Sequence, residues 1–540
     1  MVHLPLPGCI IHPPTPIASY NIEMLDPLSA AGLAIGILDV VISLGERLGD
    51  LISTAQAFED DTTTFYNLVN DENIQFKLLS KAYGGRTLFE QFDQDIQKQI
   101  VLFAGEIESI LQEGVGLLER RYGMGSDPNL PDARGRSSPS LQNLFKWTFR
   151  DRKRVAVILR TFEDRNARLK SKTEFWCFVS QLGASVAHLK HLQTNESSRR
   201  LGFDRDASLR LTQCSFPESG QAAEILELPD LSWNSHLRAI QPIKHQGALT
   251  TFTKDGVSYV QENHEYLSQD SVVDARTKHK IESLARLLHQ PKEQLFRILP
   301  CVGWKYLPAQ DCIAFVFEIQ PPPLGTPVSL QRLLFDRPER PELGDRFRLA
   351  LGLAKCISQL HMVQWLHESF RSDNILLFPH WTGEEPNRRL DVNYCQPWVF
   401  GFEYSRPEPF FSAGTSDFEP SRDIYRHPDR QGQPTQMFQK IHDIYALGVV
   451  LLEIGIWEPA LKFEKAMFAR VRNPRAVQAQ LVKHARKRLE AKVGRRYMEV
   501  VLRCLTGDFG VEDDTKEDLR LQQAFRHTVI DVLEMAASSI

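Results

Sequence analysis

The stretch HESFRSDNILLF, residues 367–378, gathers side chains of the types that act in proton transfer and metal binding. It carries His367, Ser369 and Arg371 at alternate positions, and Asn374 stands directly before an apolar run. The amide oxygen of Asn374 is a ligand type for Mg²⁺, but a hard dication needs carboxylates as well. The neutral hydroxyl of Ser369 is a poor general base near pH 7. The stretch therefore has the outline of a reaction centre in which Ser369 brings no negative charge.

A second stretch, QPWVFGFEYSRPE, carries three residues in which metal chemistry would be sought. Gly401, Phe402 and Glu403 follow an apolar run that is typical of a buried strand. Gly401 offers no side chain as a metal ligand, and the carboxylate of Glu403 stands two residues further on. We therefore predict no metal site here and no cofactor.

The residues around the first stretch predict the elements that position it. Apolar side chains in DRFRLALGLAKCISQLHM recur at the spacing that buries one face of a helix. They are Phe347, Ala350, Leu353, Ala354, Ile357 and Leu360. Upstream, ALTTFTKDGVSYVQE joins two strand-like runs through Asp-Gly, which predicts a hairpin. KIESLARLLH then predicts a helix, and CIAFVFEIQPPP predicts a buried strand that ends at the prolines.

This order of elements, together with the first stretch, makes residues 240–538 similar to a protein-kinase domain. Kinases carry H-R-D-L-x-x-x-N after the corresponding helix, and His367 and Asn374 match its first and last positions. Ser369 stands where the catalytic Asp of kinases accepts the substrate proton, and Arg371 lies two positions beyond it. The resemblance implies that His367 has a structural role and that proton acceptance is lost.

Three further motifs follow in the kinase order. Residues 401–403 stand in place of D-F-G, whose Asp holds Mg²⁺ in kinases, and form a degenerate version of it. Pro428 in DIYRHPD resembles the end of an activation segment. DIYALGVVLLEIG resembles a late kinase helix, in which Asp443 would brace the catalytic-loop backbone and Gly448 follows five residues later. The ATP-contacting Lys is missing, because Asn263 or a neighbour takes its place in VSYVQENHEY.

The region from residue 25 to about 190 predicts helices throughout. Its apolar run from Leu28 to Leu44 has 17 residues, which is short of the ~20 that cross a bilayer, and it contains Asp39. We favour a buried bundle helix over a constitutive membrane span. A soluble helix that can move into a membrane is the third alternative.

This N-terminal region resembles the fungal HeLo (prion-inhibition and propagation) domain. The resemblance rests on a Gly/Ala-rich apolar helix after DPLS and on KWTFRDRKRVAVILRTFEDRNARL, which matches a late helix of that family. It implies a helical bundle whose N-terminal segment is expelled to perturb membranes in incompatibility and cell death. The candidate membrane-segment residues are Leu33, Ile35, Ile37, Leu38, Val40 and Val41.

Composition and charge are typical of a packed multidomain chain. The net charge of -4 is too small to indicate a nucleic-acid partner. The eight cysteines never form C-x-x-C, which is typical of reduced cytosolic thiols and gives no zinc spacing. We predict a disordered extension (1–23), a HeLo-like helical bundle (24–190), a linker (191–238) and an α+β bilobal kinase-like domain (239–540).

Three functions follow from these resemblances. The favoured one is a signalling pseudokinase that regulates a HeLo bundle with membrane-perturbing cell-death activity. The alternatives are an atypical active Ser/Thr protein kinase, which would need ATP and Mg²⁺, and a non-enzymatic scaffold. The expected partners are other copies of the bundle, membrane lipids and an unidentified signalling protein. We expect a cytoplasmic protein that is recruited to a membrane on activation.

Overall fold

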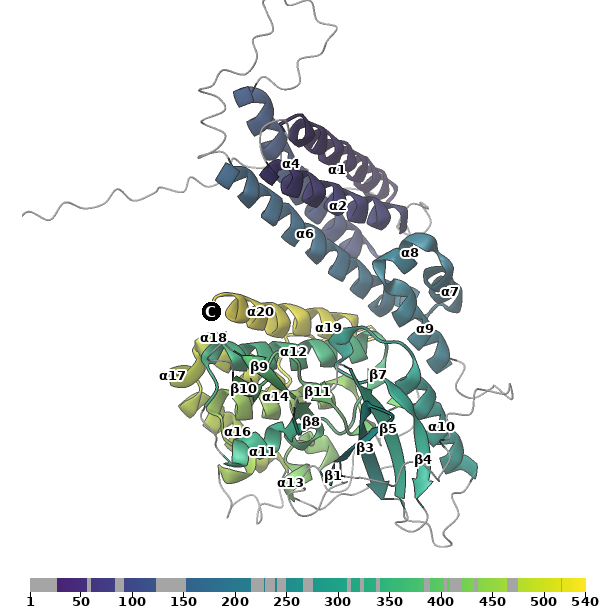
Figure 1. Ribbon diagram of the computed structural model, residues 1–540, viewed down its shortest axis with the longest axis vertical. Coiled ribbons are helices and arrows are strands. Elements are labelled where there is room, and N and C mark those ends of the chain that lie inside the picture. Colours follow the sequence, from purple (N-terminus) through teal and green to yellow (C-terminus); the bar gives the residue numbers. More distant parts are fainter. Residues whose placement is uncertain are drawn as a thin grey trace, which may run out of the picture. The chain divides into compact units, whose positions relative to one another are not determined.

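The chain forms two compact units, residues 1–174 and 175–540, in the computed structural model (Figure 1). The expected extension 1–23 and the side chains of Leu33 and Ile35 lie outside the described part, as does Glu403. The structure describes residues 27–55, 60–82, 92–122, 152–214, 228, 238–239, 249–265, 275–307, 312–320, 325–336, 340–382, 389–402, 406–407, 420–431, 436–463, 474–515 and 517–540.

The first unit is helical, as the sequence predicts. Its helices are α1 (Pro27–Ala55), α2 (Asp60–Ala82), α4 (Gln94–Tyr122) and the first part of α6 (Arg152–Val179). Helix α1 packs against both α2 and α4. The side chains between the helices are fully buried and include Val41, Ile52, Phe76, Leu111 and Phe162.

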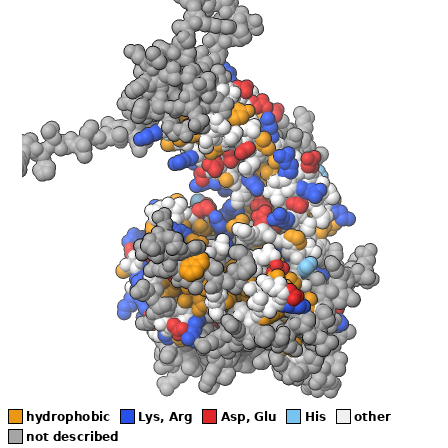
Figure 2. All heavy atoms as spheres, in the orientation of Figure 1, with side chains coloured by type: hydrophobic (Ala, Val, Ile, Leu, Met, Phe, Trp, Pro, Cys, Tyr) orange, Lys and Arg blue, Asp and Glu red, His pale blue; other side chains and the backbone are white. Residues whose placement is uncertain are grey.

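Polar and charged groups of this unit also pair across helices. Asn166 Nδ2 on α6 donates to the backbone oxygen of Glu72 on α2 at 2.9 Å and to its carboxylate at 2.6 Å. The visible surface of the helices carries charges of both signs (Figure 2), and Arg154 on α6 pairs with Glu113 on α4 at 2.9 Å. Such exposed pairs contribute about 0–1 kcal/mol each, so apolar packing holds the unit together.

The candidate membrane segment is part of this packing. Ile37, Leu38 and Val41 on α1 are buried, whereas Val40 is 42% exposed and Asp39 is exposed. Val41 lies four positions after Ile37 and three after Leu38, which places the three side chains on one helix face. Among the described residues, no helix combines the length and the apolar character of a membrane span.

The second unit begins with short helices, and the last two of them lie in the stretch 191–238 where the sequence analysis expects a linker. The end of α6 is followed by η4 (Gln181–Ala184), α7 (Val186–Thr194), α8 (Glu196–Leu201) and α9 (Phe203–Cys214). The polar residues of this stretch act as helix ends. Asn195 accepts the N–H of Ser198 and caps α8, and Gly202 ends that helix with φ +91°. Residues 191–214 therefore belong to the folded unit.

A five-stranded antiparallel sheet follows, in the order β1-β2-β3-β5-β4. Its strands are β1 (Arg238–Ala239), β2 (Leu249–Lys254), β3 (Val257–Glu265), β4 (Cys301–Leu307) and β5 (Cys312–Ile319), with α10 (Ala275–His289) and η6 (Gln294–Phe296) between β3 and β4. The predicted hairpin, helix and strand are thus confirmed as β2-β3, α10 and β5. Asp255 and Gly256 have φ values of 52° and 80°, as the Asp-Gly turn requires.

The rest of the unit consists of helices with short antiparallel strand pairs. The predicted helix is α12 (Leu343–Met362), which contacts α14 (Lys440–Ile456). One apolar core joins both helices to the sheet. The remaining helices are α11 (Leu330–Asp336), η8 (Ser372–Asn374), α13 (Pro420–Asp423), η10 (Pro428–Arg430), η11 (Ala460–Lys462), α16 (Pro474–Arg488), α17 (Glu490–Val493), α18 (Arg495–Thr506), α19 (Leu519–Phe525), the π-helical turn η12 (Arg526–Ile530) and α20 (Asp531–Ser538). The short strands are β6 (Val328–Ser329), β7 (Trp365–Leu366), β8 (Ile375–Leu377), β9 (Pro379–Thr382), β10 (Arg389–Val392), β11 (Trp398–Val399) and β12 (Arg406–Pro407).

Candidate functional site

The two stretches singled out in the sequence meet in the second unit. Strands β8 and β11 pair antiparallel, with Ile375 opposite Val399. This register places Asn374, just before β8, next to Gly401, just after β11. The backbone N–H of Phe400 donates to the oxygen of Asn374 at 2.8 Å, which holds the two segments together. Local strand pairing thus brings the predicted site residues into one place.

Asp443 on α14 anchors the loop that carries these residues. Its carboxylate accepts the backbone N–H of His367 at 2.9 Å and that of Glu368 at 3.0 Å. His361 Nε2 lies 3.2 Å from the same carboxylate. Burial raises the pKa of a carboxyl group, but here the hydrogen bonds from His361 and the His367 amide outweigh it and lower the pKa of Asp443. Asp443 is therefore a buried anion that fixes the loop backbone.

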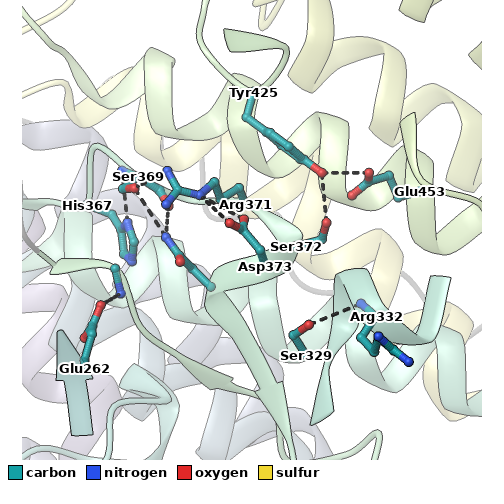
Figure 3. A network of polar contacts seen from close by, with 12 residues as sticks. Glu262, Ser329, Arg332, His367, Ser369, Arg371, Ser372, Asp373, Tyr425 and Glu453 are labelled. Carbon is teal, nitrogen blue, oxygen red and sulfur yellow. Dashed lines mark hydrogen bonds and ion pairs between the residues drawn. The ribbon is translucent and has the colours of Figure 1, made fainter. Parts of the chain in front are cut away.

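Ser369 and its neighbours form a closed polar group (Figure 3). The hydroxyl of Ser369 accepts from Arg371 Nη1 at 2.9 Å, and its backbone N–H donates to His367 Nδ1 at 3.2 Å. Arg371 Nε also donates to Asp373 at 2.9 Å. Residues 367–374 contain two carboxylates, Glu368 and Asp373. Asp373 is neutralised by Arg371 and is therefore a weak candidate for a proton acceptor.

His367 and Phe402 pack against each other behind this group. Their ring centroids are 4.6 Å apart, and both side chains are buried. The ring of Trp365 contacts Phe402 at 5.6 Å. These contacts give both predicted residues a packing role.

Asn374 and Gly401 fit together so closely that no other residue is accommodated at position 401. Asn374 Nδ2 donates to the backbone oxygen of Ser369 at 2.8 Å. A Cβ atom on residue 401 would lie 1.9 Å from that nitrogen, and Gly401 has φ +86°. Glycine is required for both reasons. The side chain of Asn374 therefore fills the space that a metal-binding side chain at position 401 would occupy.

Glu262 on β3 is a site residue that the sequence analysis missed. Its Oε1 accepts the backbone N–H of Gly401 at 2.6 Å, and the residue is only 4% exposed. His264 Nε2 lies 3.4 Å from the same carboxylate. The sequence held a signal for this residue, because successive side chains of a strand point to opposite faces of the sheet. Glu262 therefore shares the face of the buried Val260, and Asn263 lies on the other face.

In strands β2–β5, the face of the sheet that carries Glu262 holds apolar, hydroxyl, histidine and acidic side chains. Lys305 on β4 is buried and lies opposite Ala314 on β5, which in turn lies opposite Asn263 on β3. Lys305 is therefore on the face of Asn263 and not on the face of Glu262. Within β2–β5 no lysine or arginine shares the face of Glu262. The buried carboxylate of Glu262 thus has no cationic side chain from β2–β5 on its own face.

A second buried network lies behind the loop. Tyr425 contacts Ser372 at 2.8 Å and donates to Glu453 at 2.7 Å, and Glu453 also accepts the N–H of Ala460 at 2.8 Å. Burial raises the pKa of Glu453 to about 7. This network ties the loop to α14 through Ser372, Tyr425 and Glu453 (Figure 3).

Pro428 and Gly448 have structural roles. Pro428 is buried and opens η10, where its fixed φ suits a helix start. A Cβ atom at position 448 would lie 2.7 Å from Cys504 Cβ, so Gly448 permits the close approach of α14 and α18.

Three residues of metal-ligating type lie close together near η10, namely His427, Asp429 and His442. His427 Nδ1 accepts the N–H of Asp429 at 3.3 Å, and His442 Nδ1 accepts the N–H of Gln439 at 3.0 Å. An imidazole that accepts at Nδ1 carries its proton on Nε2 when neutral. Neither ring then has a free lone pair for an ion, so this group does not fit a metal.

The described residues also do not fit Mg²⁺ with a nucleotide. The Asn374 amide oxygen is one ligand, Gly401 supplies none, and Glu262 Oε1 is engaged by the Gly401 amide, which leaves Oε2 as the one remaining oxygen of that carboxylate. A hard dication would need more carboxylate oxygens than this arrangement offers. What the arrangement does is hold a loop rigidly from β3 on one side and α14 on the other.

Comparison with known proteins gives a match without an assigned activity. A family model described as "Domain of unknown function (DUF7580)" matches residues 251–539, which include all of the site just described. No curated protein matches the chain.

Proposed function

The chain belongs to the DUF7580 family, and we propose that residues 239–540 are a kinase-like domain without catalytic activity that regulates the N-terminal helical bundle. The order of elements supports the kinase-like part of this proposal. A β-hairpin, a helix and two more strands of one antiparallel sheet precede α12, the loop at 367–374 and α14. The bracing of that loop by Asp443 is the role that the resemblance assigns to this residue.

The contact between Glu262 and Gly401 is the observation that carries the inactive assignment. A kinase uses a strand lysine and a loop aspartate to hold phosphates and Mg²⁺. Here the strand contributes a carboxylate and the loop contributes glycine. A phosphate group about 4 Å from that carboxylate would be repelled by about 1–4 kcal/mol, depending on solvent exposure. Ser369 adds no charge to replace the missing base.

Nucleotide binding tests this part of the proposal. We expect that ATP shifts the midpoint of thermal unfolding of the full chain equally with and without Mg²⁺, by less than about 1 °C. The matched control is ADP with Mg²⁺, which lacks the γ-phosphate. A shift of several degrees that requires Mg²⁺ would instead support an active kinase.

For the helical bundle we propose a membrane-perturbing role that is released when α1 leaves its neighbours. The support is that Ile37, Leu38 and Val41 form an apolar face that is now covered by the bundle. Transfer of this face to lipid requires two packings of similar free energy, and the kinase-like domain would bias that equilibrium. In this proposal the protein is cytoplasmic, associates through its own bundle and is recruited to the membrane on activation.

Leakage of dye from anionic lipid vesicles tests the membrane role with the full chain. Asp39 is exposed in the bundle, so Asp39→Leu leaves the folded packing in place and removes a charge that is costly in lipid. We expect this variant to increase the leakage rate several-fold. The matched control is Asp71→Leu at an exposed site on α2, which should leave the rate unchanged. No leakage by any of the three proteins would favour the scaffold alternative.

A further inference from the structure

Arg346, in the first turn of α12, is a buried cation without a carboxylate partner among the described residues. It is 4% exposed, and its Nη1 donates to the backbone oxygen of Gly455 at 3.1 Å. Its Nε is buried and has no hydrogen-bond acceptor in the described part of the chain. Burial of an unpaired charge is unfavourable, so a guanidinium in this state indicates a missing anion.

Three more cations belong to this neighbourhood. They are Arg340 before α12, Arg488 at the end of α16 and Lys492 on α17. Arg340 interacts electrostatically with Arg346, and Lys492 interacts with Arg340, Arg488 and Arg346. Burial and repulsion from Arg340 lower the pKa of Arg346 to about 10, and burial with repulsion from Arg340, Arg488 and Arg346 lowers the pKa of Lys492. The charged forms of Arg346 and Lys492 are thus disfavoured by burial and by the cations near them.

Among the residues that interact electrostatically with Lys492, Glu458 is the one carboxylate that offsets the positive charge of this group. Glu458 lies 2.5 Å from Arg488, so it is engaged by that side chain. Neither Arg340 nor Lys492 forms an ion pair with a described residue. The group therefore carries an excess of three positive charges, and it includes one buried donor, Arg346 Nε, that has no acceptor among the described residues.

A structural explanation accounts for part of this arrangement. Gly455 is near the C-terminal end of α14, where a cation interacts favourably with the helix dipole. That role uses one N–H group of Arg346. It leaves the buried Nε without an acceptor and does not explain why Arg340 and Lys492 are held beside it.

We propose that Arg340, Arg346 and Lys492 form a binding site for a phosphate group. The planar guanidinium of a buried arginine donates to two oxygens of a phosphate, and a neighbouring lysine adds a point charge. The site lies on α12 and α17, in elements separate from Glu262 and Gly401. It does not depend on the kinase-like assignment, and it gives the second unit a place to sense a phosphorylated small molecule or a lipid headgroup.

Titration calorimetry with inorganic phosphate at constant ionic strength tests the proposal on the full chain. Lys492→Gln and Arg340→Gln change exposed side chains, so both variants should fold, and each should weaken phosphate binding roughly five- to tenfold. Lys190→Gln on α7 removes the same charge from an exposed site in another element and should have no effect. Arg346→Lys keeps the charge but loses the fork, and it should also weaken binding.

A second arm distinguishes the source of the phosphate. Vesicles of phosphatidylcholine with phosphatidic acid are compared with pure phosphatidylcholine, using wild type and Lys492→Gln. Binding of free phosphate alone indicates a soluble ligand, and retention on the phosphatidic acid vesicles that Lys492→Gln reduces indicates a headgroup. Binding in neither arm, or binding that both Gln variants retain at full strength, overturns the proposal.

Discussion

The carboxylate of Glu262 lies 2.6 Å from the backbone nitrogen of Gly401, and this hydrogen bond joins β3 to the segment after β11. The contact links two parts of the second unit that are 139 residues apart in sequence. It fixes the backbone at Gly401 with an anion that the protein itself supplies.

Glu262→Ala should lower the free energy of unfolding by about 2 kcal/mol, because the buried N–H of Gly401 loses its acceptor. Glu262→Gln keeps an acceptor oxygen and should cost less than about 1 kcal/mol. Urea unfolding of the two variants and the wild type measures both values. Equal losses for the two variants would show that the hydrogen bond has no net effect on stability.

Gly401→Ala should destabilise the fold by about 3 kcal/mol or more, from the positive φ and the overlap with Asn374. Asn374→Ala removes the overlapping nitrogen, so the double variant should be more stable than the sum of the single changes predicts, by at least about 1 kcal/mol. A double-mutant cycle in urea provides the measurement. Strict additivity would contradict the close fit that the structure gives these two residues.

Asp443→Asn should lower the free energy of unfolding by about 3 kcal/mol, because one amide cannot accept the N–H groups of both His367 and Glu368. Hydrogen exchange at these two amides should speed up in the variant. The control is Asp508→Asn at an exposed site, which should change neither quantity. Unchanged exchange at both amides would rule out the bracing role.

Glu453 should make the folded state lose stability as the pH rises from about 4.5 to about 7. Its ordinary pKa is 4.5 and burial raises the pKa to about 7, so in this interval the folded chain keeps a proton that the unfolded chain has released. Between pH 4.5 and pH 7, the free energy of unfolding of the wild type should fall by on the order of 3 kcal/mol relative to that of Glu453→Gln. Urea unfolding of both proteins at several pH values measures the difference, and a difference that does not change with pH would contradict it.

Much of the second unit was predictable because local chemistry decides it. The Asp255-Gly256 turn, the helical spacing from Phe347 to Leu360 and the strand at Cys312–Ile319 each depend on residues within one element. Asp443 was predictable for another reason, since the motif around it fixes its partners. The helical character of the first unit followed from periodicity in the same way.

Other features depend on contacts that no local pattern contains. The polar stretch after residue 191 is typical of a linker, but Asn195 and Gly202 act there as helix caps, and the buried Asp206 accepts a hydrogen bond from Gln359 on α12. Strand alternation places Glu262 on the inner face, but only the fold shows that it meets Gly401. Of Asn263 and its neighbours, which the sequence analysis considered for the missing lysine, Glu262 faces Gly401 and Asn263 lies on the other face of the sheet.

The central claim of the proposed function is that the site around Ser369 and Gly401 lacks the charges for phosphoryl transfer, and transfer of radiolabelled phosphate from ATP tests it most directly. The full chain is incubated with Mg²⁺ or Mn²⁺ and a general protein substrate, next to an Asp373→Asn variant. We predict no incorporation above background for either protein. Incorporation by wild type that Asp373→Asn abolishes would contradict the account, because it would make Asp373 a working base despite its pairing with Arg371.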